Sequence, residues 1–299
     1  MIAVIGAAGR SGAALCRALL APPPPLAGEG RGGGAIDLPE LPPFTPVVRD
    51  AAKWTATGLP GTPRLADLRD PAALREALRG ATHVVNCAHA RHAPAILAAA
   101  PADARFVFLG STRRFSRWPD DHGDGVRAGD AAFLASGRAG VMLHPTMIYG
   151  AEGEDNVQRL AALLRRIPLA PLPGGGRALV QPIHQDDLTA CILAALRRDW
   201  AGPQTIVVAG PRAMPYRDFL MAVARAAGLR PPAVLPIPGA VLMALAPLTR
   251  ILPRIPTIRA AEVRRLLEDK AFDVGPMRER LGVVGRSLED GLRLTFRAA

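Results

Sequence analysis

The chain has 299 residues, about twice the length of a typical domain, which is enough for one large α/β domain or for a nucleotide-binding domain with an appendage. Hydrophobic residues make up 49% and charged residues 21%, so the composition is globular and excludes both a wholly disordered chain and a disulfide-dense scaffold. The net charge of +11 comes almost wholly from arginines spread along the chain, and only 4% of residues are aromatic, which together disfavour a nucleic-acid-binding surface.

Short apolar runs alternate with helical patterns from the first residue, a pattern typical of βαβ units and a parallel sheet. The predicted strands are Ile2–Ile5, Pro46–Arg49, Arg64–Ala66, His83–Cys87, Arg105–Leu109, Val141–His144 and Thr205–Val208. The predicted helices between them are Ser11–Leu20, Pro71–Arg79, Ala93–Ala99, Arg127–Ser136 and Asp187–Arg197. Asp70 is expected to cap the second of these helices at its start, and Gly80 to follow its end.

Two regions depart from this alternation. Residues 21–45 are rich in proline and glycine where a doubly wound fold needs only a turn, which predicts a surface insertion. Beyond Gly150 the helical stretches are separated by prolines, which predicts a small, mainly helical substrate lobe over 151–299, with segments around 178–210 returning to the first domain. Its predicted helices are Asn156–Ile167, Tyr216–Ala227, Ala240–Ile251, Ala260–Leu267 and Ser287–Leu294.

The chain has no feature that points to export. Cys16, Cys87 and Cys191 lie far apart within apolar runs, which predicts reduced, buried thiols and a cytoplasmic location. Met1 leads directly into an apolar strand, without the basic and apolar regions of a signal peptide. The uncharged stretch from Pro231 to Thr249 is interrupted by prolines, so it predicts a buried or interfacial helix and leaves peripheral membrane contact open.

The first strand is followed by the glycine turn Gly6-Ala7-Ala8-Gly9-Arg10-Ser11-Gly12, which opens the first helix. In such a turn the first glycine permits the tight bend, the second lets the backbone approach a pyrophosphate, and the third allows the helix to pack on the strand. The helix N-terminus then faces the phosphates. The turn therefore predicts a dinucleotide site with contacts from Gly6, Ala8, Gly9, Arg10, Ser11 and Gly12.

The GxxGxxG spacing resembles that of the short-chain dehydrogenase/reductase superfamily, in its extended and atypical branches. Further segments continue the resemblance along nearly the whole chain: Val47–Asp50, Ala66–Leu68, Asn86–Ala88, Phe108–Thr112, His144–Gly150 and Gln181–Leu188. They are similar above all to the NAD-dependent epimerase/dehydratase group and its nucleoside-diphosphate-sugar epimerases. The resemblance implies a doubly wound Rossmann domain over residues 1–150, with further cofactor contacts from Arg49, Asp67, Leu68, Cys87, Ala88 and Pro145.

The second predicted strand ends at Arg49, where NAD-specific sites usually place an acidic residue that accepts hydrogen bonds from the ribose hydroxyls. Arg10 projects from the glycine turn toward the same ribose, and two guanidinium groups favour a 2′-phosphate. The expected cofactor is therefore NADP. NAD stays the alternative, because Asp50 follows Arg49 directly.

The superfamily's catalytic unit is a tyrosine with a lysine four residues later, which lowers the pKa of the tyrosine. Tyr149 and Tyr216 are the only tyrosines here, and no lysine lies between Lys53 and Lys270, so this pair is absent. Ser111, at the end of the fifth predicted strand, is the expected catalytic serine. His144 and His122 are the candidates to replace the pair, because imidazole titrates near neutral pH.

The loop after Ser111 is basic and contains two aromatic residues. Guanidinium groups of Arg113 and Arg114 suit a diphosphate or a carboxylate, and Trp118 suits stacking on a sugar or a base. The resemblance adds Thr112, Tyr149 and His184 on the substrate side. These residues predict a small anionic substrate, a sugar nucleotide or a lipid-linked sugar. His83, His89 and His92 lack the partners of a metal site and are expected to be structural, so no metal is predicted.

Two functions follow from these patterns. The first is an NAD(P)-dependent epimerase/dehydratase-like or reductase-like enzyme acting on a sugar nucleotide or a related anion. The second is a catalytically silent module that binds NADP(H) and serves regulation or assembly. The missing tyrosine–lysine pair favours the second function, whereas Ser111 and the basic loop favour the first. The sequence leaves the oligomeric state open.

Overall fold

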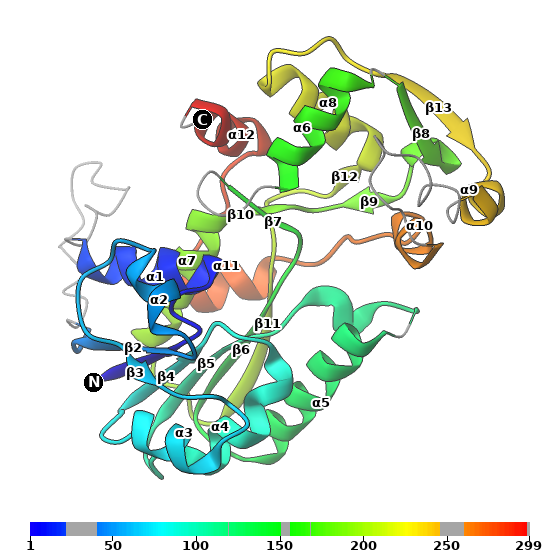
Figure 1. Ribbon diagram of the computed structural model, residues 1–299. Coiled ribbons are helices and arrows are strands. Elements are labelled where there is room, and N and C mark those ends of the chain that lie inside the picture. Colours follow the sequence, from blue (N-terminus) through cyan, green and yellow to red (C-terminus); the bar gives the residue numbers. More distant parts are fainter. Residues whose placement is uncertain (22–40, 119, 151–155, 168, 246–259, 298–299) are drawn as a thin grey trace, which may run out of the picture.

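A computed structural model describes residues 1–21, 41–118, 120–150, 156–167, 169–245 and 260–297 (Figure 1). Its centre is a parallel sheet of seven strands in the order β11-β6-β5-β4-β1-β2-β3. The strands are β1 (Ile2–Ile5), β2 (Phe44–Val48), β3 (Arg64–Leu65), β4 (His83–Asn86), β5 (Arg105–Leu109), β6 (Gly140–Pro145) and β11 (Pro203–Val208). This is the doubly wound α/β architecture that the sequence predicts.

Helices cover both faces of this sheet (Figure 1). They are α1 (Arg10–Leu20), α2 (Ala51–Thr55), α3 (Pro71–Ala77), α4 (Ala93–Ala99), α5 (Asp121–Ala135), α7 (Gln185–Leu196) and α11 (Gly275–Leu281). Successive side chains of a strand point to opposite faces, so Ile2 and Val4 pack in the core beneath α1 and α7, and Ala3 and Ile5 in the core beneath α3 and α4. The sheet is thus buried on both sides.

The remaining elements form a smaller lobe beyond the carboxyl ends of the strands (Figure 1). Its helices are α6 (Asn156–Arg166), α8 (Tyr216–Ala226), α9 (Gly239–Leu245), α10 (Ala260–Leu266) and α12 (Leu288–Arg297). Its strands pair two by two: β7 (Ile148–Tyr149) with β10 (Ile183–His184), β8 (Leu169–Pro173) with β13 (Ala233–Ile237), and β9 (Leu179–Val180) with β12 (Met214–Pro215). Phe219, Val223 and Leu292 are among the residues of its own buried core.

The element predictions differ from the structure at informative places. Helix α5 begins at Asp121, before the predicted start at Arg127, and so includes the expected loop residue His122. Glycines Gly125 and Gly129 weaken the helical pattern in the sequence, yet they let α5 approach its neighbours: a Cβ on Gly129 would lie 2.0 Å from the carbonyl oxygen of Ala90. Tertiary packing therefore outweighs local propensity here.

Two other boundaries are corrected as well. Strand β2 starts at Phe44, so the last residues of the expected 21–45 insertion belong to the sheet, and residues 22–40 lie outside the described chain. The stretch Pro231–Thr249 gives the edge strand β13 and the short helix α9 instead of one long helix, since proline is tolerated at a sheet edge and not inside a helix; residues 246–249 lie outside the description. Among the described residues, no helix is long and apolar enough to span a membrane.

Candidate functional site

The glycine turn between β1 and α1 is held by close backbone contacts. Gly6 has a φ of +74°, and a Cβ there would lie 3.0 Å from the backbone nitrogen of Ala88. A Cβ on Gly12 would lie 2.2 Å from the carbonyl oxygen of Gly6, closer than any side chain tolerates. Both positions therefore require glycine, and the turn presents its backbone and the start of α1 at the carboxyl edge of the sheet.

A first cleft of about 370 Å³ opens beside this turn. Seven residues that the sequence predicts as cofactor contacts line it: Gly6, Ala8, Gly9, Arg49, Asp67, Leu68 and Ala88. Three further polar residues line the cleft that the sequence did not assign to the cofactor: Lys53, Arg69 and His92, the last of which was expected to be structural. Asp50 also lines the cleft, and its carboxylate accepts a hydrogen bond from the Ala52 N–H at 2.9 Å as the N-cap of α2.

The other predicted cofactor residues lie around this cleft and do not line it. Arg10 begins α1 and is exposed. The Ser11 hydroxyl donates to Oε1 of Gln185 at 3.1 Å, which ties α1 to α7. Cys87 follows β4 and is half-buried, and burial raises the pKa of its thiol. Pro145 ends β6, and its carbonyl accepts a hydrogen bond from the Thr112 hydroxyl at 3.2 Å.

A second cleft of about 780 Å³ lies between the carboxyl end of β5 and the smaller lobe. Ser111, Thr112 and Arg113 line one wall, as the sequence predicts. The opposite wall contains residues that the sequence did not assign to a site: Gln181, Tyr216, Glu262, Arg265, Glu268, Lys270 and Phe272. They come from distant parts of the chain, so only the folded structure brings them to Ser111.

His144 lies behind this cleft and not in it. Its side chain is only 1% exposed, and both ring nitrogens have protein partners. Nδ1 accepts a hydrogen bond from the Ser111 N–H at 3.2 Å, so Nε2 carries the proton and donates it to Oδ1 of Asp130 at 3.1 Å. Arg114 forms an ion pair with the same buried Asp130. The predicted substrate residue Arg114 thus serves an internal network, and His144 anchors the backbone that carries Ser111.

His122, in the first turn of α5, meets a second histidine. Its Nδ1 lies 3.2 Å from Nε2 of His89, and the two rings are nearly perpendicular at 83°. His89 Nδ1 accepts a hydrogen bond from the Arg91 N–H, so its Nε2 donates to His122. Burial lowers the pKa of both imidazoles, which favours their neutral forms.

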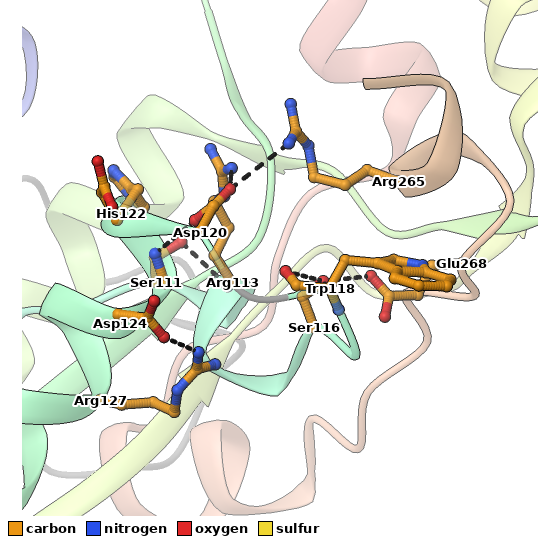
Figure 2. A network of polar contacts seen from close by, with 12 residues as sticks. Ser111, Arg113, Ser116, Trp118, Asp120, His122, Asp124, Arg127, Arg265 and Glu268 are labelled. Carbon is orange, nitrogen blue, oxygen red and sulfur yellow. Dashed lines mark hydrogen bonds and ion pairs between the residues drawn. The ribbon is translucent and has the colours of Figure 1, made fainter. Parts of the chain in front are cut away.

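One carboxylate and two guanidinium groups meet at the start of α5, at the rim of the second cleft. Asp120 caps the helix by accepting the Gly123 N–H at 2.7 Å. The same carboxylate pairs with the guanidinium groups of Arg113 and Arg265, the latter at 3.5 Å (Figure 2). Arg113 comes from the loop after β5 and Arg265 from α10, so one carboxylate joins the sheet domain to the smaller lobe.

Residues 267–273, which we call the crossing segment, run from α10 back toward α11 along the second cleft. Glu268, 7% exposed, accepts hydrogen bonds from the Ser116 hydroxyl at 2.8 Å and from the Arg117 N–H at 2.6 Å (Figure 2). The Phe272 N–H donates to Oε1 of Gln181 at 2.8 Å. These contacts attach the crossing segment to both walls of the cleft.

Besides Arg114, three more predicted substrate residues lie away from the lining of the second cleft. Trp118 is 45% exposed and has the Arg264 guanidinium 5.3 Å above its ring. Tyr149 is 1% exposed and packs on Gly291 and His184, and burial raises the pKa of its hydroxyl. His184 is 4% exposed and caps α7 by accepting the Asp186 N–H. Their placement gives Tyr149 and His184 packing roles at the junction of the lobes.

No protein-family model and no curated protein matches the sequence. Solved structures match the fold over nearly the whole chain. MoeE5 in complex with UDP-glucuronic acid and NAD is 18% identical, with a TM-score of 0.68 and coverage of 99% of this chain and 98% of that one. The NADPH-dependent quinone oxidoreductase QOR2 from Escherichia coli, complexed with NADPH, is 19% identical, with a TM-score of 0.68 and 98% coverage of both chains.

A third match is the triphenylmethane reductase of Citrobacter sp. complexed with NADP(H), 15% identical, with a TM-score of 0.69 and 100% coverage of both chains. At these identities the matches concern the fold. They confirm the Rossmann-type architecture, with its smaller lobe, that the sequence predicts.

Proposed function

We propose that this chain binds NADP(H) in the first cleft and a small anionic molecule in the second, as a short-chain dehydrogenase/reductase-like protein of the epimerase/dehydratase kind. The observation that carries the proposal is the glycine turn: Gly6 has a positive φ and Gly12 leaves no room for a Cβ, and the cleft beside them is lined by seven residues that the sequence assigns to a cofactor. The three structures compared above have NAD, NADPH or NADP(H) bound, which supports the same ligand class here.

The charges of the first cleft favour the phosphorylated cofactor. Arg49, Lys53 and Arg69 line it, against Asp50 and Asp67. Asp50 caps α2, and Asp67 accepts the Arg69 N–H at 2.9 Å, so both carboxylates already have backbone partners. Asp67 also lies 3.8 Å from the Arg69 guanidinium, and Arg49 and Lys53 add two further cations, which suit a 2′-phosphate better than a free ribose hydroxyl.

The second cleft suits an anionic substrate in contact with Ser111. Four cations line it, against three carboxylates: Arg113, Arg117, Arg265 and Lys270, and Glu262, Glu268 and Asp269. Glu268 and Asp269 already accept backbone hydrogen bonds, from the N–H groups of Arg117 and Leu179. MoeE5 binds UDP-glucuronic acid, which supports a sugar nucleotide as the substrate class. In this proposal Ser111 donates a hydrogen bond to a substrate oxygen and His144 positions Ser111 from behind. His122 pairs with His89 outside the residues that line this cleft, so no step is assigned to it.

A silent NADP(H)-binding module is the second candidate, and helix α5 favours it. Four residues after His122, on the same face of the helix, stands Val126, which is 1% exposed, where the superfamily's catalytic pair would need a lysine. General acid–base assistance contributes about 10²-fold to 10⁴-fold in rate, so its loss leaves binding without rapid turnover.

Turnover measured beside NADPH binding tests the proposal. The protein is incubated either with NADP⁺ and UDP-glucuronic acid or UDP-glucose, which are hydride donors, or with NADPH and a quinone, which is a hydride acceptor. Absorbance at the reduced nicotinamide band reports net hydride transfer, and chromatography of the nucleotide sugars reports epimerisation or dehydration, which leave the cofactor unchanged overall. NADPH is expected to raise the unfolding temperature of the wild type and not of a Gly12→Val variant. Turnover that falls about 10²-fold in Ser111→Ala supports the enzyme. Binding without turnover supports the silent module, and absence of binding contradicts both.

A further inference from the structure

Lys270 is a half-buried cation in the second cleft, and no carboxylate of the described residues forms an ion pair with it. It lies on the crossing segment and lines the cleft together with Ser111 and Arg113. Its Nζ donates a hydrogen bond to the carbonyl oxygen of Arg265 at 2.6 Å. In the described part of the chain it forms no ion pair, and an ammonium group has three N–H donors, so two of them have no protein acceptor there.

The carboxylates near Lys270 are already engaged elsewhere. Asp120 binds Arg113, Arg265 and the start of α5. Glu268 binds the Ser116 hydroxyl and the Arg117 N–H. Asp269 accepts the Leu179 N–H at 2.8 Å on β9. Among the described residues none of these carboxylates forms an ion pair with Lys270, and Glu268 offsets only part of the unfavourable effect of burial and of the neighbouring guanidinium groups on its charge.

In the absence of a ligand, the surroundings of Lys270 disfavour the charged, protonated form of its side chain. Burial lowers its pKa, the nearby Arg265 and Arg113 guanidinium groups lower it further, and Glu268 offsets part of the effect. An anion placed among these three cations would relieve the repulsion and return the ammonium group to its charged form. The backbone around Lys270 is fixed for such a contact, because its N–H donates to the Leu179 carbonyl at 2.8 Å.

We infer that Lys270 binds the anionic group of the substrate, a phosphate or a carboxylate, and so determines the specificity of the second cleft. The inference rests on the proposed function, since it assigns a residue to the substrate of that same site. Helix α5 has no lysine of a tyrosine–lysine pair. In this inference the lysine of the site is Lys270 of the smaller lobe, and it contacts the ligand instead of a catalytic tyrosine. Arg113 and Arg265 complete the anion site from the two walls.

Lysine NMR tests this assignment directly, because Lys53 and Lys270 are the only lysines of the chain. In protein labelled with ¹³C-lysine, each Cε–Hε group gives one signal, and a Lys53→Arg variant assigns them. Lys53 lines the first cleft and reports NADPH, whereas Lys270 reports the second cleft. Three probes are used. UDP-glucuronic acid carries a diphosphate and a carboxylate, UDP-glucose carries a diphosphate alone, and uridine carries neither group.

We expect the pKa of Lys270 in the free protein to lie below the ordinary value of a lysine, because burial and the nearby guanidinium groups lower it. UDP-glucose should shift the Lys270 signal and raise its pKa if the diphosphate is the bound group, and UDP-glucuronic acid alone should do so if it is the carboxylate. Uridine should do neither. Lys270→Met should weaken binding of the active probe about 10-fold or more, and Lys270→Arg should retain most of it.

A Lys270 signal that stays unchanged at saturating UDP-glucuronic acid and UDP-glucose, while the Lys53 signal responds to NADPH, overturns the inference and leaves the proposed cofactor site standing. A Lys53 signal that ignores NADPH contradicts the proposed function itself. A Lys270→Met variant that binds both nucleotide sugars as the wild type does also overturns the inference.

Discussion

The Nε2 atom of His144 lies 3.1 Å from Oδ1 of Asp130, and the two side chains are only 1% and 2% exposed. The other ring nitrogen accepts the N–H of Ser111, so the pair links α5 to the residue at the entrance of the second cleft. Gly110 makes this approach possible, because a Cβ there would lie 2.3 Å from Nδ1 of His144. The position of Ser111 thus depends on a buried carboxylate in another element.

Removal of that carboxylate should destabilise the fold strongly. Asp130→Ala leaves the Arg114 charge and the His144 N–H without their partner, a change that costs about 3–5 kcal/mol for a buried pair. Asp124→Ala is the matched control on the same helix, since Asp124 pairs with Arg127 at the exposed surface and such pairs contribute about 0–1 kcal/mol. Urea unfolding of both variants measures the difference. Equal losses would show that the buried network is not stabilising.

The glycine turn should not accept even one methyl group at Gly12. A Cβ at 2.2 Å from the Gly6 carbonyl forces the turn or α1 to move, and such overpacking costs about 1–3 kcal/mol. Gly12→Ala is therefore expected to unfold at lower urea concentration and to lose NADPH binding. Gly202→Ala is the control, because no atom lies within 4 Å of its Cβ position. A Gly12→Ala protein that binds NADPH like the wild type would refute this account of the turn.

The histidine pair should make stability depend on pH. Burial lowers the pKa of His89 from its ordinary value of 6.5 to about 4, and lowers that of His122 in the same direction. The unfolded chain then binds protons that the folded chain does not, so stability is full above pH 6.5 and falls as the pH decreases toward 4. Unfolding temperatures across this range should fall less steeply in His89→Gln than in the wild type. If the unfolding temperatures of the two proteins fell in parallel with pH, the histidine pair would not be the source of the pH dependence.

Local signals explain why much of the first domain could be predicted from the sequence. Asp70 caps α3 as expected, and the turn from Gly6 to Gly12 follows β1, because both depend on residues close in the chain. The start of α5 was missed, since the glycines that allow its close packing lower its helical propensity. The crossing segment was missed for another reason: Glu268 meets Ser116 across 152 positions, and no local pattern reports such a contact.

The same limit applies to the candidate site. Ser111, Thr112 and Arg113 were identified because they follow a strand at the carboxyl edge of a parallel sheet. The burial of His144 could not be predicted, because it depends on Asp130 and Arg114, which belong to separate elements. The sequence assigned no site role to Lys270, because its position in the second cleft follows from the fold of the smaller lobe.

Calorimetric titration of the wild type with NADPH and with NADH tests the central claim most directly, namely that the cleft beside the glycine turn binds a phosphorylated dinucleotide. Arg49→Ala removes a cation from that cleft, and Arg75→Ala, on the exposed face of α3, serves as the control. We predict that the wild type binds NADPH more tightly than NADH, that Arg49→Ala weakens NADPH binding about 10-fold and leaves NADH binding unchanged, and that Arg75→Ala changes neither. NADH affinity equal to or above that of NADPH, or undiminished NADPH binding in Arg49→Ala, would contradict the account.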